Sequence, residues 1–242
     1  MGPVARPPAL PIADGVWRIP TLGADLVNSF AFCDPDGPVT LVDAGLRGAT
    51  PRLVAALSAI GRRPEDVACI VVTHAHLDHV GSARALRART GAPLHVHRDD
   101  AAFVRQGRPP PRDPASPLGR VLSFAQRRQA RCDVDDTFAE GDVVPGPGGL
   151  RVLHTPGHSP GHCSFLHDRS GVLVTGDALA NFRSRIGYSF FSSCTSFAMS
   201  QDTADRLGEV DYEVAAFTHG PEIGHGARDS VRAFLRRRLA EG

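Results

Sequence analysis

The stretch Val67-Ala68-Cys69-Ile70-Val71-Val72-Thr73-His74-Ala75-His76-Leu77-Asp78-His79 determines the predicted fold and site. Its first half is a continuous apolar run with adjacent valines, typical of a strand covered on both faces. In an extended chain, residues two apart point the same way, so His74 and His76 can share one metal ion. A turn into the next helix can direct Asp78 and His79 towards a second ion. One loop therefore predicts two half-sites for metal.

Around this stretch, the hydrophobic pattern alternates between strands and helices, which predicts an α/β fold with sheets enclosed between helix layers. The predicted strands are Val16–Ile19, Leu26–Cys33, Val39–Asp43, Val67–Thr73, Pro93–His97, Leu150–His154, Cys163–His167, Val172–Thr175 and Val214–Thr218. The predicted helices are Thr50–Ile60, Val80–Arg89, Leu118–Ala130 and Ala227–Leu239. We expect one domain over residues 1–242 with a proline-rich tail at 1–12 and insertions at 103–132 and 181–198.

Composition excludes several classes of protein. The chain has 27 basic and 26 acidic residues and a net charge of +1, so it carries no field that would gather nucleic acid or a membrane surface. It contains no lysine, which excludes Schiff-base and P-loop lysine chemistry. Five cysteines without CxxC spacing predict free thiols. No signal-peptide pattern or membrane-length apolar run is present, so we expect a cytoplasmic protein.

Further candidate ligands follow other predicted strands. His158 lies in a tight turn bounded by proline and glycine, and His162 lies four residues later. We expect His158 to bind metal and His162 to contact a ligand or a core group instead. Asp177 and His219 each stand at the end of a predicted strand. His95 and His97 alternate on a predicted strand, where at least one is expected to pack in the core or cap a hydrogen bond, and His154 is expected to be structural or exposed.

Taken in order, these motifs resemble those of the metallo-β-lactamase superfamily over nearly the whole chain, roughly Val16 to Leu239. The motifs are Val42-Asp43-Ala44-Gly45, the His74 to His79 loop, Thr155-Pro156-Gly157-His158, Gly176-Asp177 and His219-Gly220. The resemblance implies a four-layer αββα sandwich of two mixed β-sheets flanked by helices, with a two-metal centre at the sheet edge.

The resemblance also implies a role for each residue. The implied ligands are His74, His76 and His158 for the first ion, Asp78, His79 and His219 for the second, and Asp177 as the bridge. Asp43 would orient ligands or their loop, and Asp78 and Asp177 would be the catalytic carboxylates. Such a donor set suits zinc best, with iron or manganese as alternatives. Two such ions make a bridging hydroxide available at neutral pH, which implies a hydrolase acting on an ester, thioester or lactone of a small molecule.

The subfamily is less well defined by the sequence. True β-lactamases commonly use a cysteine ligand and a lysine, and this chain has Asp177 and no lysine. Hydroxyacylglutathione hydrolases and persulfide dioxygenases carry Gly-Cys-Gly-Arg after the bridging aspartate, whereas Ala178 to Phe182 follow it here. Acyl-homoserine lactonases have a tyrosine at the position of Ala180. The alternatives are a mono-iron sulfur dioxygenase on the same fold and a non-catalytic metal-binding relative.

The segment from Asn181 to Ala198 is the candidate substrate wall. It holds five aromatic residues and two arginines, a mixture that fits an apolar acyl or aromatic body with an arginine available for a carboxylate. The candidate substrate-binding residues are Arg183, Arg185, Tyr188 and Phe190. A hydrophobic mini-core beneath a long loop or a homodimer contact would explain the same composition.

Overall fold

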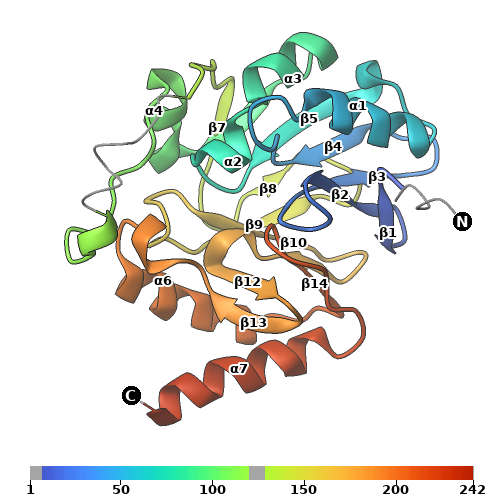
Figure 1. The fold of residues 1–242 in the computed structure, drawn as a ribbon. Helices are drawn as coiled ribbons and strands as arrows, with labels where there is room; N and C mark the ends of the chain where they lie inside the picture. Colours follow the sequence, from blue (N-terminus) through green and yellow to red (C-terminus); the bar gives the residue numbers. More distant parts are fainter. Residues whose placement is uncertain (1–6, 120–128, 242) are drawn as a thin grey trace, which may run out of the picture.

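Two β-sheets pack face to face in the computed structural model, which describes residues 7–119 and 129–241, and helices cover both outer surfaces (Figure 1). The first sheet has seven strands in chain order: β1 (Leu10–Ala13), β2 (Val16–Leu22), β3 (Val27–Cys33), β4 (Val39–Val42), β5 (Val67–Val72), β6 (Leu94–His97) and β7 (Asp136–Phe138). Strands β1 to β4 are antiparallel neighbours, whereas β4 to β7 run parallel, so the sheet is mixed.

The second sheet has five strands in the order β14 (Val214–Ala216), β11 (Val172–Val174), β10 (Cys163–His167), β9 (Leu150–His154) and β8 (Val143–Val144). Strand β11 is parallel to β14, and the other pairs are antiparallel. A separate hairpin is formed by β12 (Leu179–Phe182) and β13 (Arg185–Tyr188).

Three apolar clusters separate the layers and follow from the strand pattern. Side chains of one face of each sheet, such as Phe30, Val71 and Phe165, meet in a wholly buried cluster between the sheets. The other face of the first sheet packs under α1 (Thr50–Ala59), α3 (Ala83–Thr90) and α4 (Arg98–Gln106). The other face of the second sheet packs under α6 (Phe197–Ala204) and α7 (Ala227–Glu241). The predicted αββα sandwich is confirmed.

Short elements connect these layers. They are the helix α2 (Leu77–Val80) and the 3-10 turns η1 (Pro64–Asp66), η2 (Gly176–Ala178), η3 (Phe191–Ser193) and η4 (Asp205–Gly208). All five cysteines are free, as predicted, and all five are buried. Among the described helices, none has the length and apolar character needed to cross a bilayer.

Strand β1 and helix α4 differ from the simple pattern expected there. Strand β1 begins at Leu10, within the expected proline-rich tail. Helix α4 occupies 98–106, where no helix was predicted. The prediction missed it because the buried Asp100 lies on the core-facing side of the helix beside Ala101 and Val104 and interrupts the apolar pattern. The predicted helix Leu118–Ala130 falls largely on 120–128, outside the described residues.

The hairpin β12–β13 was expected to be irregular. Its two-residue turn, Arg183-Ser184, has φ values of +50° and +60°, which glycine and asparagine usually supply. Without either residue, the sequence carries no recognisable turn signal. The hairpin lies between η2 and η3 and borders the site described below.

Candidate metal centre

The carboxyl ends of several strands meet at one edge of the sandwich. The loop after β5 carries His74 and His76, the turn after β9 carries His158, β11 leads into Asp177, and β14 leads into His219. Parallel strands end at the same edge, which is why residues far apart in the sequence converge there.

Three imidazoles form the first cluster. His76 Nδ1 lies 3.0 Å from His74 Nε2 and 2.8 Å from His158 Nε2. Burial lowers the pKa of His74 and His158 well below the usual value and that of His76 to about 4. The rings are therefore neutral at pH 7, and each can offer one nitrogen lone pair to a cation held between them.

A second cluster adjoins the first. Asp78 Oδ2 lies 3.6 Å from His79 Nε2 and 3.4 Å from His219 Nε2. His79 is fully buried, and its Nε2 has no hydrogen-bond partner. A buried nitrogen without a hydrogen-bond partner that faces a carboxylate and a second imidazole is typical of a metal ligand.

Asp177 lies between the two clusters. Its Oδ2 is 3.2 Å from both His158 Nε2 and His219 Nε2, and its Oδ1 is 3.4 Å from His79 Nε2. Thr218 Oγ1 donates to Oδ1 at 2.7 Å, and this bond fixes the plane of the carboxylate. The residues of both clusters therefore share one carboxylate, as a bridging ligand would.

The carboxylates of the second cluster attract positive charge. Burial disfavours the charged form of His219 and lowers its pKa, but the effect of the Asp177 and Asp78 carboxylates is larger and raises the pKa to about 10. Burial likewise opposes charge on His79, yet Asp78, Asp177 and Asp43 raise its pKa well above the usual value. The cluster thus favours bound positive charge, which a divalent cation supplies.

Asp43 orients one of these ligands without facing the centre. It directly follows β4 with a φ of +65°, and its Oδ2 accepts the Nδ1 proton of His79 at 2.8 Å. Its Oδ1 accepts the backbone N–H of Thr73 at 2.8 Å. Because Nδ1 is held by Asp43, Nε2 is the ring nitrogen of His79 that faces the cluster.

His162 has both ring nitrogens engaged by protein. Its Nε2 accepts the backbone N–H of Asp177 at 2.7 Å, so Nδ1 carries the proton and donates to the Thr155 carbonyl at 2.9 Å. No lone pair remains for a metal. Its contact with the backbone of Asp177 shows how it supports that ligand.

Three residues at the site carried no signal in the sequence. Ser189 Oγ donates to Asp177 Oδ2 at 3.3 Å, and Cys194 Sγ lies 3.5 Å from His158 Nδ1. Burial raises the pKa of the Cys194 thiol to about 12, so it is uncharged. The third, Asp100, is buried and bonds to two ligand-bearing loops. A lone serine, cysteine or aspartate has no spacing that would have revealed it.

The candidate substrate residues divide between the two faces of the β12–β13 hairpin. Phe182 faces the centre, where its ring is stacked on that of His219, and it also contacts Phe190. Phe182 is the direct cross-strand partner of Arg185, which puts Arg185 on the same face.

Tyr188 lies on the opposite face, and its ring centroid is 5.0 Å from that of Phe234 on α7. Arg183 is exposed in the turn. The structure therefore brings Phe190 and Arg185 to the side of the candidate metal centre and directs Tyr188 towards the apolar cluster beneath α6 and α7.

His97, Asp99 and His154 form another group of possible donors, with ligand atoms within 4.8 Å. The rings of His97 and His154 are stacked, with centroids 4.1 Å apart and planes inclined by 18°. Nitrogen lone pairs lie in the ring plane, so two nearly parallel rings cannot both direct them at one ion. This group is a structural stack beside helix α4.

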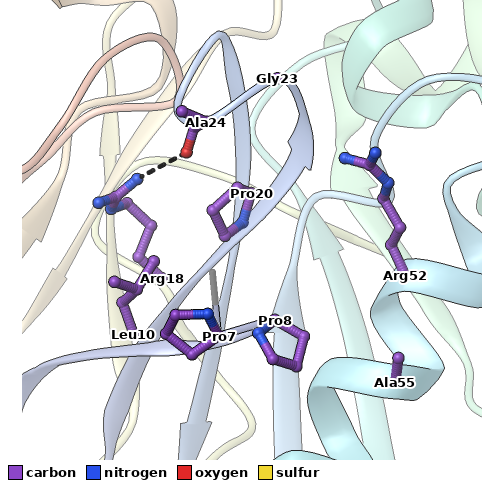
Figure 2. Close-up of a pocket in the computed structure, with 9 residues that line it drawn as sticks. All are labelled: Pro7, Pro8, Leu10, Arg18, Pro20, Gly23, Ala24, Arg52 and Ala55. Carbon is purple, nitrogen blue, oxygen red and sulfur yellow. Dashed lines mark hydrogen bonds between the residues drawn. The ribbon is translucent and has the colours of Figure 1, made fainter. Parts of the chain in front are cut away.

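A pocket of 510 Å³ lies apart from the metal clusters, between the β2–β3 turn and α1 (Figure 2). Prolines form much of its wall, with Arg18 and Arg52 at its sides, and Arg18 Nη1 donates to the Ala24 carbonyl at 3.4 Å. None of its lining residues belongs to a metal cluster, so we do not assign the reaction to it.

Comparison with known proteins agrees with this geometry. A sequence model of the metallo-beta-lactamase superfamily matches residues 22–219. An N-acyl homoserine lactonase from Bacillus cereus is 29% identical over 191 residues, which cover 73% of this chain and 65% of the lactonase. Hydroxyacylglutathione hydrolase GloC from Haemophilus influenzae is 27% identical over 167 residues, 68% of this chain and 71% of that protein.

The solved structure of Rm3 metallo-beta-lactamase superposes with a TM-score of 0.71 at 21% identity, covering 98% of this chain and 95% of that one. At this identity the superposition shows a shared fold. The match spans just under two thirds of the length of several curated relatives, the lactonase among them, at 62–66%.

Proposed function

Because the chain belongs to the metallo-β-lactamase superfamily, we propose that it is a two-metal hydrolase that cleaves an ester, thioester or lactone bond of a small molecule. The observation that supports this most is the position of Asp177, whose carboxylate lies within 3.4 Å of nitrogens in both clusters. A centre for a single ion would not need a carboxylate shared in this way.

The residues present fit two divalent ions. His74, His76 and His158 would hold the first ion, and Asp78, His79 and His219 the second, with Asp177 shared. Imidazole nitrogen and carboxylate oxygen favour zinc, with iron or manganese as alternatives. When bound, such ions lower the pKa of water and polarise a carbonyl group, the chemistry that acyl-bond hydrolysis requires.

The protein's own contribution is to fix these donors before substrate arrives. Thr218 and Ser189 each donate to one oxygen of Asp177, so its carboxylate cannot rotate away. Asp43 selects the tautomer of His79. Such a preorganised shell avoids the cost of arranging ligands during the reaction.

Substrate would lie along the metal-facing side of the hairpin β12–β13. Phe182 and Phe190 offer an apolar wall whose ring centroids are 5.5 Å apart, and Arg185 stands at its outer end. We propose that the wall holds the acyl or aromatic body and that Arg185 pairs with a carboxylate where the substrate has one. Arg183 in the neighbouring turn is a further candidate from the sequence, whereas Tyr188, which contacts Phe234, lies on the other face of the hairpin.

The test is elemental analysis of protein purified without added metal, followed by a panel of esters, thioesters and lactones assayed with defined zinc, iron or manganese. We expect about two ions per chain and metal-dependent hydrolysis of at least one class. One iron per chain with oxygen consumption on a persulfide would identify the sulfur dioxygenase instead. Bound metal without turnover of any class would favour a non-catalytic relative.

A further inference from the structure

Asp100 is a wholly buried carboxylate that joins two loops of the candidate metal centre. It lies in the first turn of α4, outside every ligand motif, and has no exposed surface. It accepts three hydrogen bonds, one from Ala75 and two from the turn containing Ser159 and Gly161. These partners lie on different loops and are distant from Asp100 in the sequence.

The bond to Ala75 acts on the spacing of two ligands. Ala75 stands between His74 and His76, and its N–H donates to Asp100 Oδ2 at 2.8 Å. Its carbonyl accepts from Gln129 Nε2 at 3.1 Å. Both backbone polar groups of Ala75 are thus held by side chains, beyond the end of β5 where the sheet no longer supplies partners.

The other two bonds act on the turn that carries the third ligand. Ser159, which follows His158, donates to Asp100 Oδ2 at 2.6 Å, and the N–H of Gly161 donates to Oδ1 at 2.7 Å. The approach is close enough to require glycine, because a Cβ at position 161 would lie 2.6 Å from the Asp100 backbone nitrogen. The carboxylate therefore fixes the turn on both sides of Pro160.

We propose that Asp100 is a positioning residue that sets the separation between the His74–His76 loop and the His158 turn. It thereby raises the metal affinity of the first site and not that of the second. This inference rests on the proposed function, because it assigns the first cluster to a metal ion. The physical reason is that one rigid carboxylate satisfies donors of both loops, so neither loop can shift without breaking a buried charge-assisted bond.

The second cluster provides an internal comparison. The bonds of Asp100 reach the N–H of Ala75, between His74 and His76, and the hydroxyl of Ser159, next to His158. His219 is instead held by the Leu26 carbonyl, which accepts from its Nδ1 at 2.6 Å. Loss of Asp100 should therefore weaken the first site and leave the second nearly unchanged, whereas a general loss of stability would affect both sites.

The test isolates each site. An Asp78→Ala background removes a second-site ligand and leaves the first site to be titrated with zinc against a chromogenic chelator. A His76→Ala background leaves the second site in the same way. We expect Asp100→Asn to weaken zinc binding about 10- to 100-fold in the first background and less than about 3-fold in the second.

Asn is the informative replacement because it keeps the shape of the side chain. Its amide group would face either the Ala75 or the Gly161 N–H, placing two donors opposite each other. Asp99→Asn is the matched control, since Asp99 lies in the same helical turn and its exposed side chain bonds to neither loop. We expect it to leave both affinities within about 2-fold of the parent.

Zinc binding by the unmodified protein is measured first, so that the two proposals can be separated. Absence of binding there overturns the proposed function. Binding of two ions, with Asp100→Asn weakening both sites equally or neither, overturns the role of Asp100 alone. If Asp100→Asn does not fold, Ser159→Ala carries the test, because it removes one bond of the three and should still weaken only the first site.

Discussion

The ring of Phe182 lies over that of His219, with centroids 6.1 Å apart and planes inclined by 28°. An apolar side chain is thereby in contact with a candidate ligand of the second ion. We expect Phe182→Ala to raise KM about 10-fold for the best substrate, which corresponds to about 1.4 kcal/mol of binding. Steady-state kinetics over an acyl-length series should show a larger effect for longer chains, since each buried methylene contributes about 0.8 kcal/mol.

The control for this variant is Phe191→Ala. Phe191 contacts Phe197, with centroids 5.3 Å apart, and is partly exposed. Its removal should leave KM unchanged across the series. Equal effects of the two variants would place the acyl chain elsewhere.

Tyr188 should behave as a packing residue. Its ring contacts Phe234 and Phe197, so Tyr188→Ala should lower the free energy of unfolding by about 2 kcal/mol, less than for a fully buried aromatic ring. Thermal and denaturant unfolding measure this effect, and kcat/KM should change little. A variant with unchanged stability and a raised KM would show instead that Tyr188 contacts substrate.

Replacing the shared carboxylate should remove function and leave the fold. Asp177→Asn keeps the shape of the side chain but presents a neutral amide to two cations, so we expect loss of bound metal and at least about a 100-fold fall in kcat. Thr218→Val removes a hydrogen-bond donor to Asp177 and leaves the charge of Asp177 in place, so it should lower kcat and bound metal less. Full activity of Asp177→Asn with two bound ions would be incompatible with the proposed centre.

His162→Ala should separate support from ligation. Because both ring nitrogens of His162 bond to protein, the variant should retain both metal ions and lose about 10- to 100-fold in turnover. Metal content by elemental analysis and kcat are measured on the same preparation. Loss of one equivalent of metal would make His162 a ligand and call the role of His158 into question.

Acid should destabilise the protein in part through His97. Burial, together with His154, lowers its pKa from 6.5 to about 4, so the folded protein binds this proton less readily than the unfolded chain does. Stability from this group is full above pH 6.5 and falls between pH 6.5 and 4, by up to 1.4 kcal/mol per pH unit at a full one-proton difference. His97→Asn keeps an acceptor at the start of α4 and should flatten the curve over that window. A slope equal to that of the parent would assign the effect to other groups.

Much of the candidate centre could be predicted because its candidate ligands share a simple relation to the strands. His74, Asp177 and His219 each follow a strand with a clear apolar pattern, and parallel strands bring their carboxyl ends together. Strands β9 and β10 were predicted with the bounds that the structure shows. The alternation of strands and helices predicted sheets enclosed between helix layers, and the resemblance to the metallo-β-lactamase superfamily implied the four-layer sandwich.

The residues that hold the ligands could not be predicted, for a physical reason. Asp100 bonds to Gly161, which is 61 positions away, and Cys194 reaches His158 across 36 positions. Such contacts depend on tertiary packing, and a single aspartate or cysteine has no periodicity to mark it. The face of Tyr188 was equally hidden, because it depends on a hairpin whose turn has neither glycine nor asparagine.

The irregular segment before residue 120 and the segment after β13 are joined by hydrogen bonds. The N–H of Asp113 donates to the Cys194 carbonyl, the Asp113 carboxylate accepts the N–H of Phe197, and Thr195 Oγ1 donates to the Pro111 carbonyl. Each of these loops supplies the other with hydrogen bonds that solvent or a foreign loop would have to replace. In directed evolution of substrate range, the two segments should therefore be exchanged together. A library that replaces either segment alone would mostly yield variants that have lost these hydrogen bonds.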